Sequence, residues 1–178
     1  QLSPTLHKEE PFRILVAGGG TGDPTLACAQ SFDLAGISVQ VVHLDLSSRS
    51  NQIARLRAAN FLDKSLAQSI LFVRGSIAAA VAVVNDRCCI NELEYSEHTH
   101  NPLQLLDIDN PQHACQIASI FSKKFHYIHS TGVLHHSRSP EQSLRELSSL
   151  LKEDIGGMGL WVYASSGGRD GVHDFQKM

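Results

Sequence analysis

A cluster of glycines near the amino terminus is the first feature of this sequence that could bind a ligand. Residues 17–23 read Ala-Gly-Gly-Gly-Thr-Gly-Asp, and they follow an apolar segment that is typical of a buried strand. Glycine has no side chain, so the backbone can turn sharply and a ligand can lie against the main chain. Several nucleotide-binding folds use such a loop between a strand and a helix, although a tight turn without a ligand has the same pattern.

An acidic residue, Asp45, ends the second apolar segment, at residues 38–44. In a doubly wound sheet the carboxyl ends of the first two strands are neighbours, so we expect Asp45 beside the glycine loop. A carboxylate can accept hydrogen bonds from both hydroxyls of a ribose. The loop and Asp45 together predict an adenosine-containing ligand, while the simpler alternative is that Asp45 only caps the next helix.

The charge at the entrance of the following helix indicates which adenosine ligand fits. A dinucleotide fingerprint, G-x-G-x-x-G, that started at Gly18 and Gly20 would need its third glycine where Asp23 stands. A carboxylate there would repel a pyrophosphate at the helix N-terminus. It would tolerate a ligand that carries a sulfonium and an ammonium group, so the charge favours S-adenosylmethionine over NAD(P).

The order of the apolar segments predicts the elements that hold these residues in place. Strand-like runs alternate with amphipathic, helix-like segments along the chain. This alternation predicts an α/β fold in which a doubly wound, mostly parallel sheet has helices on both faces. The expected strands are residues 12–17, 38–44, 70–73, 125–129 and 158–164, and the expected helices begin near residues 23, 47, 111 and 139.

Residues 78–110 depart from this alternation. Residues 78–84 fit a helix or a strand equally well, residues 91–100 are polar and acidic, and a loop is expected between Pro102 and Pro111. A long irregular stretch in a compact domain is typical of a lid or a binding insertion. We therefore expect a single domain over residues 1–178 with an insertion at about residues 78–110.

Local signals predict where helices begin and which side of each faces the core. Asp23 and Ser139 are expected to cap their helices, each with a proline at the first helical position. Gln142 is expected to reach back and complete a capping box with Ser139. Apolar spacing predicts two buried stripes, made of Ile53, Leu56 and Ala59 in one helix and of Leu144, Leu147, Leu150 and Leu151 in another.

Four segments together resemble the class I (Rossmann-like) S-adenosylmethionine-dependent methyltransferases. Residues 14–22 resemble the first motif of that family, and Asp45 matches its ribose-binding acid. Residues 125–136 (FHYIHSTGVLHH) resemble the fourth-strand motif of the branch that acts on quinones and small molecules, and residues 144–162 resemble the family's last leucine-rich helix and strand. The family's sheet has two more strands, so the resemblance implies either that this chain is a partial methyltransferase domain or that another segment completes the sheet.

The resemblance also implies roles for individual residues. The cofactor S-adenosyl-L-methionine would contact Gly18, Gly19, Gly20, Thr21, Gly22, Asp45, Leu46, Ser76, Ile77, Ser130 and Thr131. His135 and His136 are the candidate catalytic bases, because imidazole titrates near neutral pH. The sequence departs from the family at Val16, where an acid is common, and at Ser76, where an aspartate often contacts the adenine.

Composition narrows the classes of partner. The chain has 178 residues and a formal net charge of −3, which argues against broad electrostatic binding of nucleic acid. The four cysteines are interpreted as free thiols of a cytoplasmic protein. No metal site is expected, and no membrane span or targeting signal is recognised in the sequence. The methyl acceptor is expected to be a small molecule, and a protein acceptor is left open. Two other functions remain as alternatives to a methyltransferase: an NAD(P)-dependent oxidoreductase and an inactive methyltransferase-like interaction domain.

Overall fold

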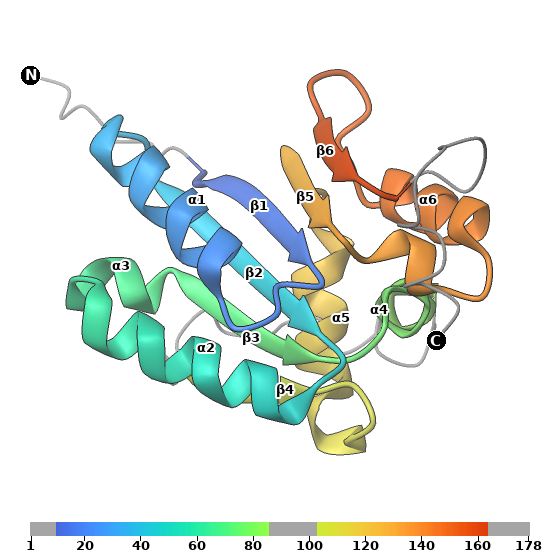
Figure 1. The fold of residues 1–178 in the computed structure, drawn as a ribbon, viewed down its shortest axis with the longest axis horizontal. Coiled ribbons are helices and arrows are strands. Elements are labelled where there is room, and N and C mark those ends of the chain that lie inside the picture. Colours follow the sequence, from blue (N-terminus) through green and yellow to red (C-terminus); the bar gives the residue numbers. More distant parts are fainter. Residues whose placement is uncertain (1–9, 86–102, 164–178) are drawn as a thin grey trace, which may run out of the picture.

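The computed structural model describes residues 10–85 and 103–163, and these residues form an α/β fold built on one parallel sheet (Figure 1). The strand order is β4-β3-β2-β1-β5-β6, and every pairing between neighbouring strands is parallel. The strands are β1 (Phe12–Ala17), β2 (Val39–Asp45), β3 (Ile70–Arg74), β4 (Leu105–Asp107), β5 (Tyr127–Thr131) and β6 (Gly157–Trp161).

Six α-helices in the described residues connect and cover these strands. They are α1 (Asp23–Leu34), α2 (Ser48–Phe61), α3 (Lys64–Gln68), α4 (Ile77–Asn85), α5 (Ala114–Ser122) and α6 (Pro140–Ser149). Two short 3-10 turns, Pro111–His113 and Leu134–His136, precede α5 and α6. The chain thus alternates between strand and helix as the sequence predicts.

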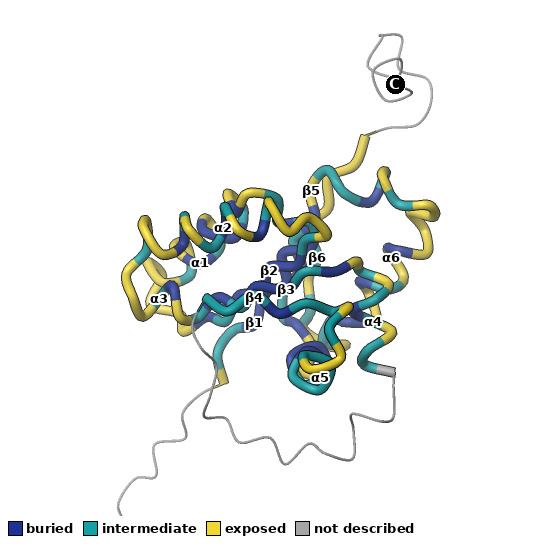
Figure 2. Tube along the Cα trace, turned by 90° about the horizontal axis from the view of Figure 1, so that it is seen from below, coloured by how far each residue is buried: buried dark blue, intermediate teal, exposed yellow. Residues whose placement is uncertain are grey.

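The sheet separates two apolar cores. On one face α1, α2 and α3 pack against the sheet, and on the other face α4, α5 and α6 do so. Figure 2 shows the buried residues gathered along the strands and on the inner sides of these helices. The strand order changes direction between β1 and β5, and the carboxyl ends of parallel strands at such a switch point are where α/β folds bind ligands.

A buried arginine at the start of β1 connects the sheet to α5. The Arg13 side chain is 5% exposed, and it donates hydrogen bonds to the Gln40 side chain at 2.9 Å and to the Ile120 carbonyl at 2.8 Å. It also donates to the Lys123 carbonyl and lies over the Phe125 ring, 4.6 Å from the ring centroid. Arg13 therefore satisfies carbonyls at the C-terminal end of α5 while it holds that end beside β1 and β2.

Several of the predicted helices, strands and loops differ from those in the structure. The expected loop between Pro102 and Pro111 contains β4, the expected fourth strand begins at Tyr127 rather than at Phe125, and α3 is not predicted at all. Residues 78–84 are helical within α4, which resolves that ambiguity. The polar stretch at residues 91–100 lies outside the described residues.

The predicted helix faces are also partly wrong. In α2 the buried residues are Asn51, Ala54 and Ala58, whereas Leu56 is 59% exposed. In α6 Leu147 is fully buried but Leu144 is 39% exposed. Alanines face the sheet in α2 because a helix that packs closely against strands leaves little room for larger side chains.

None of the helices within residues 10–85 and 103–163 combines the length and the apolar character that a membrane crossing requires.

Candidate functional site

The glycine loop joins β1 to α1 at the carboxyl end of the sheet. Gly18 and Gly22 have positive φ values of 75° and 99°, which a residue with a side chain rarely adopts. The N–H groups of Gly18 and Gly19 donate to the Leu44 carbonyl at 2.8 and 3.2 Å, and the Gly22 N–H donates to the Gly19 carbonyl at 3.0 Å. The loop is therefore tied to the end of β2.

Asp45 lies against this loop, as the sheet topology predicts. Its Oδ2 accepts a hydrogen bond from the Gly20 N–H at 2.8 Å, and its Oδ1 accepts one from the Ser47 N–H at 2.8 Å. The cap of α2 is Ser47, whose hydroxyl accepts from the Ser50 N–H, so Asp45 is not the cap of the next helix. Each carboxylate oxygen can accept a further hydrogen bond, so both stay available to a ligand.

A cavity of about 590 Å³ opens beside Gly18 and Asp45. Its walls come from the carboxyl ends of β2 and β3, from the turn after β5 and from α6. Six residues singled out from the sequence line it: Gly18, Asp45, Leu46, Ser76, Ile77 and His136. These residues come from four separate connections, and the fold brings them to one place.

Other predicted residues lie beside the cavity or face away from it. Gly19 and Gly22 are buried residues of the loop and do not line the cavity, and the Gly20 N–H donates to Asp45. Thr21 is exposed, and its hydroxyl lies 3.2 Å from the Asp23 carboxylate. Thr131 is also exposed, at the end of β5, and its hydroxyl is 3.0 Å from a nitrogen of His129.

Ser130 differs from these residues because its side chain is buried without a partner. It is 1% exposed, and its hydroxyl has no hydrogen-bond partner among the described residues. A buried hydroxyl normally finds a partner, because burial without one costs free energy. Ser130 is not among the residues that line the cavity, so the structure does not bring its hydroxyl into the site.

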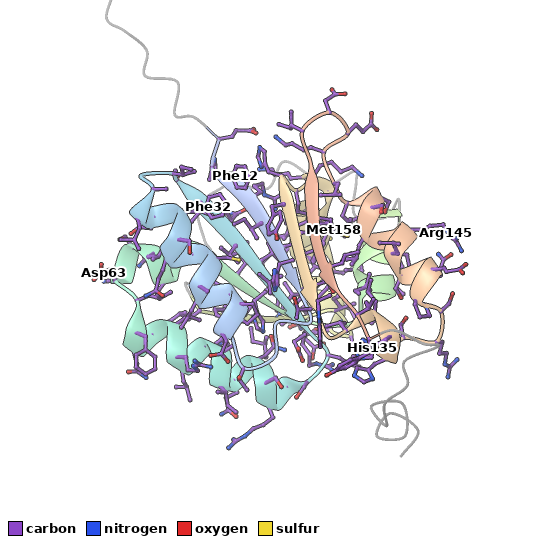
Figure 3. All side chains as sticks on the ribbon, turned by 45° about the horizontal axis from the view of Figure 1, so that its top comes forward. Phe12, Phe32, Asp63, His135, Arg145 and Met158 are labelled. Carbon is purple, nitrogen blue, oxygen red and sulfur yellow. The ribbon has the colours of Figure 1, made fainter. Side chains whose placement is uncertain are left out.

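The two candidate catalytic histidines occupy different environments. His136 is exposed and lines the cavity, whereas His135 packs between the rings of His136 and Tyr163, at centroid distances of 4.0 and 4.6 Å. Both ring nitrogens of His135 are buried without a partner among the described residues, and burial lowers its pKa. Figure 3 shows His135 at the edge of the molecule where the strands end. His136 therefore lines the cavity, whereas His135 does not.

Asp23 is placed differently from the prediction. The cap of α1 is Gly22 in the left-handed conformation, and Asp23 makes no capping hydrogen bond. Its carboxylate pairs with the Arg57 guanidinium at 2.5 and 2.8 Å, and the same guanidinium donates to the Thr21 carbonyl at 3.1 Å. The hydrogen bond from Arg57 lowers the pKa of Asp23 to about 2. This pairing offsets much of the negative charge, so the charge argument against a pyrophosphate is weaker than the sequence indicates.

The fold is similar to that of solved structures over most of the chain. The CMeT domain of the citrinin polyketide synthase is 24% identical and has a TM-score of 0.53, over 85% of this chain and 28% of that one. The [4+2]-cyclase SpnF is 19% identical and has a TM-score of 0.51, over 84% of this chain and 38% of that one. This chain has the fold of the class I methyltransferases. It spans less than two fifths of the length of either matched structure, and the sequence itself matches no protein-family model and no curated protein.

In this methyltransferase fold, α6 supplies a wall of the cavity that the sequence does not reveal. Arg138, Gln142 and Glu146 line the cavity from the start and first turns of α6. The Ser139 hydroxyl caps the helix by accepting from the Gln142 N–H, while the Gln142 side chain bonds Glu146 rather than reaching back to Ser139. The helix start was visible in the sequence, but its position across the cavity from the carboxyl ends of β2 and β3 depends on the tertiary fold.

A second missed residue lies below the glycine loop. His43, on β2, is fully buried, and its Nδ1 is 2.7 Å from the Thr25 hydroxyl in the first turn of α1. The Nε2 atom has no partner among the described residues. Burial lowers the pKa of His43 to about 4, so the ring is neutral at physiological pH. A histidine within an apolar strand gives no sequence signal that separates this position from an ordinary core position.

The lowered pKa of His43 predicts a loss of stability in mild acid. The unfolded chain takes up a proton at His43 as the pH falls through 6.5, but the folded chain does so only near pH 4. The free energy of unfolding should therefore fall by about 3 kcal/mol between these values. Urea denaturation at pH 7.5 and 4.5 measures this change, and His43→Asn should remove much of it. An equal fall in the free energy of unfolding of the variant would show that His43 is not its cause. Asp23 does not contribute in this range, because the lowered pKa of its carboxyl affects stability only below pH 4.

No group of three or more potential metal ligands lies together in residues 10–85 and 103–163.

Proposed function

We propose that this chain is the S-adenosylmethionine-binding part of a methyltransferase that acts on a small molecule. The observation that carries the proposal is the position of Asp45, whose carboxylate bonds the glycine loop at 2.8 Å at the mouth of a cavity of about 590 Å³. A free acceptor beside a turn that exposes main chain suits a nucleoside sugar.

The residues present fit such a cofactor. Asp45 would hold the ribose hydroxyls, while Leu46, Ser76 and Ile77 line the cavity where the adenine would lie. S-adenosylmethionine, when bound, supplies an electrophilic methyl group on a sulfonium. The protein's part is to orient the acceptor and exclude water, which can account for most of the acceleration.

His136 is the base that this arrangement favours. It lines the cavity and is exposed, whereas His135 is enclosed by neighbouring rings. If the acceptor must lose a proton before it attacks, a neutral imidazole at position 136 can take that proton. We therefore assign the candidate role to His136 and a packing role to His135.

The main rival is an NAD(P)-dependent oxidoreductase. Its support increases once Asp23 is seen to pair with Arg57, because the charge at the helix entrance is then largely offset. The third possibility is an interaction domain that retains the fold alone. The matched structures do not decide among these, since one of them is a [4+2]-cyclase.

Isothermal titration calorimetry separates the three functions. We expect the chain to bind S-adenosylhomocysteine with a dissociation constant on the order of micromolar, and NAD at least tenfold more weakly. Binding of NAD alone would overturn the proposal in favour of the oxidoreductase. A folded protein that binds neither ligand would favour the interaction domain, and circular dichroism provides the control for folding.

A further inference from the structure

Gly19 differs from the other glycines of the loop in its backbone conformation. Its φ does not lie in the left-handed region, unlike those of Gly18, Gly20 and Gly22. Backbone conformation therefore does not explain why this position carries glycine.

The neighbouring imidazole does explain it. A Cβ atom built on Gly19 would lie 2.3 Å from Nδ1 and 2.4 Å from Cε1 of His43. Real Cβ contacts are not this short, so a side chain at position 19 would force either the loop or the ring to move. The ring cannot move easily, because it is fully buried, bonded to Thr25 and packed against Phe72 at a centroid distance of 5.2 Å.

We propose that His43 is a positioning residue for cofactor binding, because its ring supports the glycine loop from below and fixes the path of the loop. The His43 side chain connects the loop to α1, because Gly19 packs against the ring and Thr25 of α1 is hydrogen-bonded to it. The path of the loop in turn places Gly18 at the cavity wall and the Gly20 N–H against Asp45. This role rests on the proposed function, in which the cavity binds S-adenosylmethionine.

A double-mutant cycle tests the contact directly. Gly19→Ala should weaken the binding of S-adenosylhomocysteine about tenfold or more, because the methyl group and the imidazole compete for one space. In a His43→Ala background, where the ring is absent, the same Gly19→Ala change should cost less than about threefold. Equal costs in the two backgrounds would overturn the proposal.

Gly20 provides the matched control within the same loop. No atom lies within 4 Å of a Cβ built on Gly20, but its φ is +55°. Gly20→Ala should therefore weaken binding through backbone strain alone, by the same factor with and without His43→Ala. A rescue of Gly20→Ala by His43→Ala would show that the second change only loosens the whole loop, and would overturn the specific contact.

Further variants separate positioning from general stability. His43→Ala should itself weaken the binding of S-adenosylhomocysteine, because the loop loses its support. His43→Asn retains a polar group that can bond Thr25, and it should restore most of that affinity. Val39→Ala removes a buried side chain at the far end of β2, so it should lower the melting temperature without changing affinity. If affinity decreases in parallel with melting temperature across all these variants, the proposal is overturned. If His43→Ala does not fold, His43→Ser replaces it in the double-mutant cycle.

The outcomes for the proposed function and for His43 are distinct. A folded wild-type chain that does not bind S-adenosylhomocysteine overturns the proposed function, and the role of His43 falls with it. A wild-type chain that binds, with additive effects in the cycle, overturns only the role of His43.

Discussion

Asp45→Ala is expected to weaken the binding of S-adenosylhomocysteine by about 100-fold. Loss of the ribose hydroxyl contacts costs about 1–3 kcal/mol. The variant also removes the acceptor for the Gly20 N–H and the Ser47 N–H, which lie 2.8 Å from the two carboxylate oxygens. The loop would then lose the tie that holds it at the cavity mouth. Calorimetric titration of the two proteins measures the change.

Asp63 provides a matched control for the loss of a carboxylate. It is exposed at the start of α3, away from the cavity, and it makes no capping hydrogen bond (Figure 3). Asp63→Ala should leave the affinity unchanged, and Asp45→Asn should fall between the wild type and Asp45→Ala because its amide oxygen still accepts hydrogen bonds. Equal affinities for Asp45→Ala and Asp63→Ala would remove the basis for the proposed cofactor site.

Arg13→Met is expected to lower the free energy of unfolding by about 3–5 kcal/mol. Methionine fills a similar length but leaves the carbonyls of Ile120 and Lys123 without their charged donor, beside the Phe125 ring. Burial lowers the pKa of Arg13 to about 10, so the side chain is charged at neutral pH and these hydrogen bonds are charge-assisted. Urea denaturation monitored by circular dichroism measures the loss.

Arg49 serves as the comparison for Arg13. It is exposed on α2 and makes one hydrogen bond, to Gln52 at 3.3 Å. Arg49→Met should change the free energy of unfolding by no more than about 0.5 kcal/mol. If Arg13→Met were as mild as Arg49→Met, the apolar replacement would compensate fully for the lost hydrogen bonds, and Arg13 would have no net stabilising role.

The architecture could be predicted from the sequence because its signals are local. Alternating apolar runs predicted five of the six strands described here, and the proline and serine at residues 139–140 predicted the start of α6. β4 was missed because it has three residues, too few for a strand pattern to stand out beside two prolines. The buried face of α2 was predicted wrongly because it is made of Ala54, Ala58 and the polar Asn51 rather than of the larger apolar residues of the helix.

The site was predictable where it follows from sheet topology. Asp45 and Gly18 meet because the ends of adjacent parallel strands lie together, whatever the loops do. Asp23 was misinterpreted because its partner, Arg57, lies in another helix, and pairing at that sequence separation leaves no local pattern. The α6 wall and His43 were missed for the same reason, since their importance comes from packing between elements.

The strand order has a consequence for biosynthesis. β1 pairs with the nearby β2, which begins at Val39, but its other neighbour is β5, whose paired residues begin at Tyr127. Translation at about 5–20 residues per second places that partner on the order of ten seconds later. Throughout this interval one edge of an apolar strand is open to pairing with other chains, and the carbonyl partners of Arg13 have not yet emerged. We therefore expect the nascent chain to be most prone to aggregation before β5 leaves the ribosome.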